Sequence, residues 1–298
     1  MKIAHGGFVP VYRPRPSALH AARASVAASF CLSLALVPVL YEHPLVLAAA
    51  GCAALAAAAA AGVTSELTRA AKLTVPLVLL IVAVNPIASQ NGETLLVRGG
   101  EALGRRWDVT LEALAFGGVA GLRLLVLFTV FSLYSAVVDP DEVLRLFRRI
   151  SYRSALTASL ATRLVPIVGR DALRMSDAAR CRPRPPGAAA AARAALAGAL
   201  DRAVDVAAAL EVRGYATARR ARPERKPWSR HDVRVAAAAL GIAAAAIGAR
   251  AAGAGWFEAY PRLELALGAP ELALCTALVA FAAAPFAGAA GRLGVARA

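Results

Sequence analysis

The segment PLVLAAAGCAALAAAAAAGV, Pro44–Val63, decides the fold class of this chain. It carries no charged side chain, and it has the length of roughly 20 apolar residues that a helix needs to cross a bilayer. The rest of the chain has the same character, since 59% of its 298 residues are hydrophobic and its mean hydropathy is +0.58. Soluble domains are only about 45–50% apolar. The composition therefore predicts an all-α polytopic membrane protein.

Further apolar runs lie on both sides of this segment, and together they predict about six transmembrane helices. The other runs are Ala24–Leu40, Leu73–Ala88, Ala113–Val138, Val235–Phe257 and Leu272–Gly291. Pro76 interrupts the run at 73–88, which is short for a span. A polar loop, residues 89–112, separates the third and fourth runs, and we expect a short interfacial helix there, around Glu101–Arg106.

The formal net charge of +15 is concentrated in residues 139–232, which hold most of the arginine. Cytoplasmic loops of membrane proteins are enriched in Lys and Arg, so this block and both termini are predicted to be cytoplasmic. The chain then divides into an N-terminal segment (1–23), four spans (24–138), a cytoplasmic domain (139–232), and two spans with a tail (233–298). Because the chain contains no nucleic-acid-binding motif, we attribute the positive charge to cytoplasmic topology beside the lipid bilayer, and nucleic acid is not an expected partner.

The sequence contains no pattern typical of an enzyme, a metal site or a cofactor site. The four cysteines form no CxxC pair, and the four histidines are isolated. No Walker-type phosphate loop is present, so the chain is not expected to hydrolyse ATP itself. Arg123 is the only charge well inside a span. Such charges are often functional, but here we favour a structural or topological role for Arg123. Gly117 and Gly121 form a small-xxx-small pair that permits close helix approach.

Three helices are predicted within the cytoplasmic block. Asp139 and Pro140 start the first one, because Asp can cap the free N–H groups and Pro suits the first helical position. Ser154–Arg182 is the second, with an expected bend at Pro166. Ala188–Arg213 is the third, and Gly214 provides its C-terminal stop.

The second and third helices of this block each end in an arginine motif. The first motif is Ala179-Arg180-Cys181, and the second is Glu211-Val212-Arg213-Gly214. A guanidinium at a helix end can bind a carboxylate through two hydrogen bonds, and small neighbours let such an end enter a groove. Two such ends suit a dimeric partner. The alternative is that each arginine complements its own helix dipole and the anionic lipid surface.

With these motifs the chain resembles the transmembrane coupling (T) component of energy-coupling-factor transporters, the family of EcfT and CbiQ proteins. The matching features run in order over nearly the whole chain. They are Asn85-Pro86, Gly121-Leu122-Arg123, Asp139-Pro140, Arg163-Leu164-Val165-Pro166, Ala179-Arg180 and Glu211-Val212-Arg213-Gly214-Tyr215.

The resemblance implies a protein of the bacterial inner membrane that works with two ABC ATPase subunits, alike or different. It also implies a membrane-embedded S component that captures a vitamin or a transition-metal ion such as cobalt or nickel. By resemblance, Arg180 and Arg213 would dock into the ATPases and carry their motion to the S component. The first motif departs from the family pattern, because Cys181 stands where glycine is usual. The other hypothesis is a permease or scaffold whose basic block serves only topology and lipid contact.

Overall fold

The structure is a computed structural model of the chain. It describes residue 12 and residues 14–88, 94–97, 101–102, 105–106, 109–147, 152–183, 187–214, 227–258, 264–265 and 268–287. The chain forms two compact units. One unit combines Met1–Val143 with Trp228–Ala298, and the other is Leu144–Pro227. We call them the membrane unit and, after the role that the sequence resemblance implies, the coupling unit.

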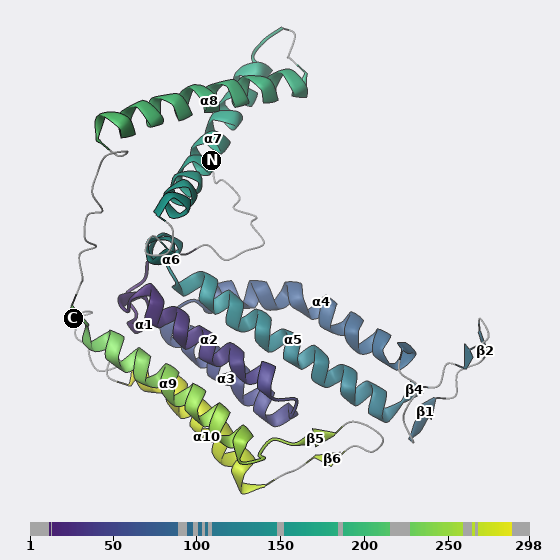
Figure 1. Cartoon of the computed structure of the whole chain (residues 1–298). Helices are drawn as coiled ribbons and strands as arrows, with labels where there is room; N and C mark the ends of the chain where they lie inside the picture. The colour runs from purple at the N-terminus through teal and green to yellow at the C-terminus, as the bar shows by residue number, and fades with distance from the viewer. Residues whose placement is uncertain are drawn as a thin grey trace, which may run out of the picture. The chain divides into compact units, whose positions relative to one another are not determined.

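The membrane unit is a bundle of long helices. They are α2 (Ala24–Leu40), α3 (Pro44–Ala61), α4 (Thr64–Ala88), α5 (Leu111–Val137), α9 (Arg230–Ala251) and α10 (Ala269–Ala283). A single turn, α1 (Ala18–Ala21), precedes them, and a 3₁₀ turn, Ala284–Phe286, follows α10. Figure 1 shows the bundle as three neighbouring pairs, with α2 and α3 between the α4–α5 pair and the α9–α10 pair.

The lengths of these helices agree with the predicted membrane protein. In the described residues, five helices are long and apolar enough to cross a membrane: α3, α4, α5, α9, and α10 together with its 3₁₀ turn. The sixth, α2, is equally apolar but has 17 residues, or about 25 Å at 1.5 Å per residue. The prediction of an all-α polytopic membrane protein with about six spans is confirmed.

Small residues bring these helices close together. The buried face of α3 consists mostly of alanine, and the side chains of Phe30 and Leu34 from α2 are buried in the same core. Gly121 of α5 faces α4 so closely that an added Cβ would lie 2.8 Å from Cγ1 of Val78. An added Cβ at Gly117 would lie 3.1 Å from Cβ of Asn85. The glycine pair therefore marks the contact between α4 and α5, as its spacing predicted.

Several predicted helix boundaries were wrong by a turn or more. The third span was expected at 73–88, but α4 starts at Thr64 and continues through both Pro76 and Pro86. Its polar first turns are helical because Glu66 favours the positive end of the helix dipole. The fifth span was expected at 235–257, but α9 ends at Ala251, before Gly253 and Gly255, which both have left-handed φ values. Part of the predicted sixth span lies beyond Ala287, outside the described residues.

Three short antiparallel strand pairs are described in the segments between α4 and α5 and between α9 and α10. Strand β1 (Leu95–Val97) pairs with β4 (Val109–Thr110), and β2 (Glu101–Ala102) pairs with β3 (Arg105–Arg106), both antiparallel. Strands β5 (Phe257–Glu258) and β6 (Glu264–Leu265) form the third pair. The interfacial helix expected around Glu101–Arg106 was therefore wrong. The glycines at 99, 100 and 104 lower the helix propensity of this segment.

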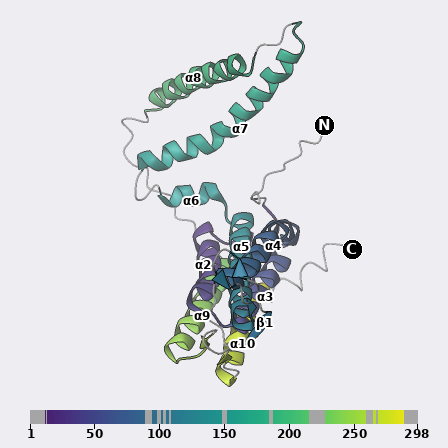
Figure 2. The same ribbon diagram turned by 90° about the vertical axis from the view of Figure 1, so that its right-hand side faces the viewer.

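The coupling unit is built mainly from two long helices. They are α7 (Tyr152–Arg180) and α8 (Ala188–Val212), which pack against each other, and Figure 2 shows them as a pair. A shorter helix, α6 (Pro140–Phe147), begins in the membrane unit and ends in the coupling unit. These helices match the three predicted for the cytoplasmic block to within about two residues at each described end.

Candidate functional site

The first arginine motif closes α7. Arg180 is the last residue of this helix, and its side chain is exposed. The amide of Cys181 donates a hydrogen bond to the carbonyl of Ala178 at 3.3 Å, and the amide of Arg182 donates to that of Ala179 at 3.2 Å. Ala179 is half-buried and Cys181 is exposed. The chain thus leaves the helix through a tightened turn, and Arg180 is exposed at that turn.

The second motif closes α8 in a tighter geometry. Arg213 is the C-cap residue, and Gly214 takes a left-handed φ of 70°. The amide of Gly214 donates to the carbonyl of Glu211 at 2.8 Å. Glycine adopts this conformation without the steric cost that a Cβ brings. Gly214 is therefore the C-terminal stop that the sequence predicted. Glu211 and Arg213 are exposed, and Val212 is 89% exposed.

Neither motif arginine has an acidic partner among the described residues. No ion pair joins Arg180 or Arg213 to a carboxylate within the part of the chain that the structure describes. Their situation differs from that of Arg202, nearly three turns before the end of α8, whose Nη1 lies 2.6 Å from Oδ2 of Asp171 on α7. In the described part of the chain, both arginine side chains are thus exposed and outside any ion pair.

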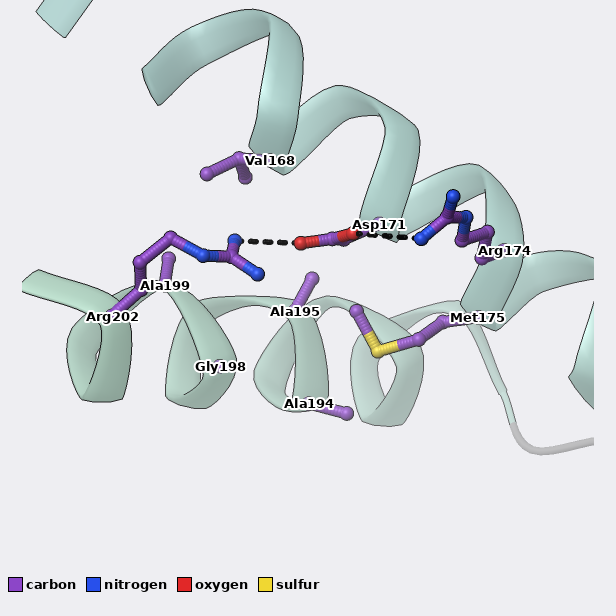
Figure 3. Close-up of a pocket in the computed structure, with 9 residues that line it drawn as sticks. All are labelled: Val168, Asp171, Arg174, Met175, Ala194, Ala195, Gly198, Ala199 and Arg202. Atoms are coloured by element: carbon purple, nitrogen blue, oxygen red, sulfur yellow. Dashed lines mark ion pairs between the residues drawn. The ribbon is translucent and has the colours of Figure 1, made fainter. Parts of the chain in front are cut away.

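The pair Asp171–Arg202 fastens α7 to α8, as Figure 3 shows. Asp171 also lies 3.9 Å from Nη1 of Arg174 on its own helix. Beside these charges is an open groove of about 260 Å³, formed on the α8 side by small residues that include Gly198 and on the α7 side by Val168 and Met175. Small residues on α8 let the two helices approach each other here. The distance between the two arginine motifs therefore depends on this contact.

Two further residues named from the sequence lie before the coupling unit, and one lies within it. Oδ1 of Asp139 accepts a hydrogen bond from the amide of Asp141 at 2.9 Å, so Asp139 caps α6 and Pro140 opens it, as predicted. Pro166 lies exposed inside α7, which continues through it.

Burial and the nearby carboxylates of Asp139 and Glu142 raise the pKa of the Tyr12 phenol.

The intramembrane residues named from the sequence fall into two clusters. Asn85 and Pro86 lie in the last turn of α4, and Asn85 faces Gly117 of α5. Arg123 lies elsewhere on α5, where its Nη2 is 3.0 Å from Oε1 of Glu42 and donates to the carbonyl of Tyr41 at 3.2 Å. Arg123 therefore ties α5 to the turn between α2 and α3. This contact agrees with the structural role favoured for it.

Tyr41 holds the same turn against the other side of the bundle. Its ring is buried, and its hydroxyl donates to the carbonyl of Ala246 on α9 at 2.6 Å. An added Cβ at Gly255 would lie 2.5 Å from the ring. Burial raises the pKa of this phenol above its usual value, and the charge of Arg250 offsets part of that rise.

Sequence reasoning missed the pairings between distant segments. Asp171 and Arg174 have the i,i+3 spacing of a helical pair, but no local pattern indicates that Asp171 meets Arg202. Ser229 and Asp232 form a capping box, a local signal that would have placed the start of α9 at Arg230. Among the described residues, no group of three His, Cys, Asp or Glu side chains is placed to hold a metal ion.

Comparison with known proteins supplies the family. Residues 16–224 match the family model CbiQ, described as cobalt transport protein. The matched range spans α1 to α8 and includes both arginine motifs. No curated protein gives a significant match to the chain. Since the family model covers well over half of the chain, this multi-pass membrane protein belongs to the CbiQ family of cobalt transport proteins.

Proposed function

We propose that this chain is the transmembrane coupling component of an energy-coupling-factor importer. It transmits ATP-driven motion from two cytoplasmic ABC ATPase subunits to a membrane-embedded S component that captures the substrate. The observation that carries the proposal is the pair of exposed helix ends, with Arg180 closing α7 and Arg213 closing α8. Both arginines lack acidic partners in the described residues, and both lie within the range matched to the CbiQ family.

The surface of the coupling unit supports a protein partner. None of its described residues, from 144 to 214, is buried. Large apolar side chains are exposed along both helices: Val165, Leu173, Leu196, Leu200, Val204 and Val212. Exposed apolar surface on a charged unit is typical of a binding surface. The apolar residues would supply contact area, and the arginines would bind carboxylates in the ATPase grooves.

The proposed topology follows from the charge distribution. The coupling unit and both chain termini are cytoplasmic, and the bundle lies in the bacterial inner membrane, because the basic residues concentrate between α5 and α9. Catalysis of ATP hydrolysis belongs to the partner subunits. The family description favours a transition-metal ion, cobalt first, as the transported substrate, with a vitamin as the other class.

The test is a double charge reversal, Arg180→Glu with Arg213→Glu, in the complete transporter. We expect loss of co-purification with the ATPase subunits and loss of cobalt uptake, because each carboxylate would repel the acidic groove. The matched control is Arg170→Glu with Arg193→Glu. These arginines are exposed on the same two helices but away from their ends, so the change in net charge is identical. The control should assemble and transport normally.

The alternative is that the arginine-rich block serves only topology and lipid contact. In that case the two double variants would behave alike, since both remove the same positive charge from the same helices. Intact assembly and uptake in the Arg180/Arg213 variant, with the chain correctly inserted, would rule out the coupling function.

A further inference from the structure

Helix α2 begins without a cap of its own. Its N-cap residue is Arg23, whose side chain makes no capping hydrogen bond. The first N–H groups of any helix lack acceptors within the helix and need them from elsewhere. Here two carboxylates from distant parts of the chain supply them. The amide of Arg23 donates to Oδ1 of Asp232 at 2.7 Å, and the amide of Ala24 donates to Oε2 of Glu142 at 3.1 Å.

These two carboxylates flank the coupling unit in the chain. Glu142 lies in the first turn of α6, just before the unit begins at Leu144. Asp232 lies in the first turn of α9, just after the unit ends at Pro227. Consecutive backbone amides of one helix therefore bind the segment by which the chain enters the unit and the segment by which it leaves.

Asp232 is held from several sides. It is 2% exposed, and its Oδ2 accepts from the amide of Ser229 at 2.9 Å. The same oxygen lies 3.6 Å from Nε of Arg23. The guanidinium of Arg23 lies 5.4 Å from the ring centroid of Trp228, within range of a cation–π contact. A buried carboxylate with satisfied oxygens keeps its position, because breaking its bonds would leave a charge unpaired.

The helix that receives these bonds is in turn fixed in the core. Phe30, Leu34 and Val37 of α2 are fully buried, and α2 packs against α3, α5 and α9. Backbone amides cannot move without the helix that contains them. A displacement of Glu142 or Asp232 therefore acts on the first turn of α2 and, through it, on the centre of the membrane unit.

We propose that Glu142 and Asp232 are positioning residues: they bind to α2 the two segments of the membrane unit that flank the coupling unit in the chain, and they pass movement of these segments to the membrane helices. We call these two hydrogen bonds to α2 the joint. Its role in transport rests on the proposed coupling function, but its effect on the position of the flanking segments does not. Both bonds are electrostatically favourable, because each carboxylate meets the positive end of the α2 dipole.

The mechanical effect is measured by double electron–electron resonance on the full chain in lipid nanodiscs. Spin labels go on Cys52, exposed on α3, and Cys181, exposed after α7, in a Cys31→Ala, Cys275→Ser background. We expect Glu142→Gln with Asp232→Asn to broaden the distance distribution between the two labels. A distribution of the same width as that of the parent, in a variant with parental helix content, would overturn the proposal.

Two matched controls separate the joint from local effects. Asp141→Asn removes a neighbouring carboxylate that does not bond α2, and Ser229→Ala removes the cap of α9 but leaves Asp232 in place. Both should give a distribution of the same width as that of the parent. If the double variant fails to fold, two single variants replace it: Glu142→Gln, and Ala24→Pro, which removes the amide that donates to Glu142. We expect each to broaden the distance distribution, and an unchanged width in both would overturn the proposal. Proline suits the first helical position, and Arg23 already has the extended ψ of 146° that proline requires of its predecessor.

A second measurement distinguishes this proposal from the proposed function. In the complete transporter, loss of the joint should lower cobalt uptake per ATP hydrolysed while the ATPase subunits still co-purify. Proportional loss of uptake and hydrolysis would count against a positioning role. The two proposals can also give opposite results. If Glu142→Gln with Asp232→Asn broadens the distance distribution, but Arg180→Glu with Arg213→Glu still binds the ATPase subunits, the positioning role is supported and the coupling function is contradicted.

Discussion

The membrane unit and the coupling unit differ in how they are held together. The membrane unit has a continuous core in which large side chains such as Phe30, Leu34 and Leu133 are fully buried. In the coupling unit, by contrast, none of the described residues is buried, and the link between α7 and α8 is the Asp171–Arg202 pair beside small residues. The first unit therefore has a buried core of its own, whereas the described residues of the second leave their large apolar side chains exposed.

Glycine and alanine have different roles in the two units. In the membrane unit, small residues let buried helices approach without a driving force from water. In the coupling unit, the alanines of α8 give a helix that is stable in itself, because alanine has the highest helix propensity. The large apolar side chains of α7 and α8 are exposed and not used to pack a core. Under the proposed function they would contact another protein.

The largest effect is expected from breaking the core of the membrane unit. Gly121→Val places a branched side chain where a single Cβ already lies 2.8 Å from Val78. Overpacking of this kind costs about 1–3 kcal/mol and would separate α4 from α5. The melting temperature of the detergent-purified chain should fall clearly. Gly118→Val is the control, since an added Cβ there meets nothing within 4 Å; equal destabilisation by both would contradict the close contact.

The next effect tests the coupling unit at its two ends separately. We expect Arg213→Glu to reduce cobalt uptake more than Arg180→Glu, because the left-handed Gly214 closes the second helix end, whereas Cys181 follows Arg180 at the first. Uptake is measured in cells that express the complete transporter, with the amount of each variant in the membrane determined in parallel. Equal losses, or a greater loss for Arg180→Glu, would show that the two ends do not differ in this way.

A smaller effect is expected at the link between α7 and α8. Asp171→Asn removes the charge that Arg202 contacts. Both side chains are partly exposed, so the pair contributes at most about 1 kcal/mol after screening by solvent. Hydrogen exchange in α7 and α8 should accelerate, while exchange in α2 and α5 stays unchanged. Asp177→Asn, on an exposed residue of α7, is the control and should leave exchange as it is.

The sequence predicted the division into a membrane unit and a coupling unit better than it predicted the contacts inside each unit. The charge-free run Pro44–Val63 and its counterparts indicated the bundle, since such runs are compatible with little besides membrane helices. Helix ends with a local signal, such as Asp139-Pro140 and Gly214, were also predicted correctly. The arginine motifs were recognised from their position at helix ends, and their role remains a proposal.

What the sequence could not predict depends on tertiary structure. Arg23 and Asp232 are separated by most of the chain, and no local pattern pairs them. Polar residues such as Thr64 and Arg230 belong to the membrane helices although hydropathy alone excludes them. Their inclusion depends on capping and dipole effects at the helix starts.

The smallest effect concerns the difference between the two helix ends themselves. Gly214 has a φ of 70°, a conformation that costs a residue with a Cβ about 1–2 kcal/mol. Gly214→Cys should therefore loosen the end of α8 and weaken ATPase binding several-fold. Cys181→Gly should strengthen binding only slightly, because glycine permits the left-handed turn at the end of α7 but also adds freedom to the unbound chain. Affinity for the purified ATPase subunits measures both changes. If Cys181→Gly gave the larger change, the first motif would be limited by its cysteine, and the asymmetry between the two ends would have to be assigned to Cys181 rather than to the geometry at Gly214.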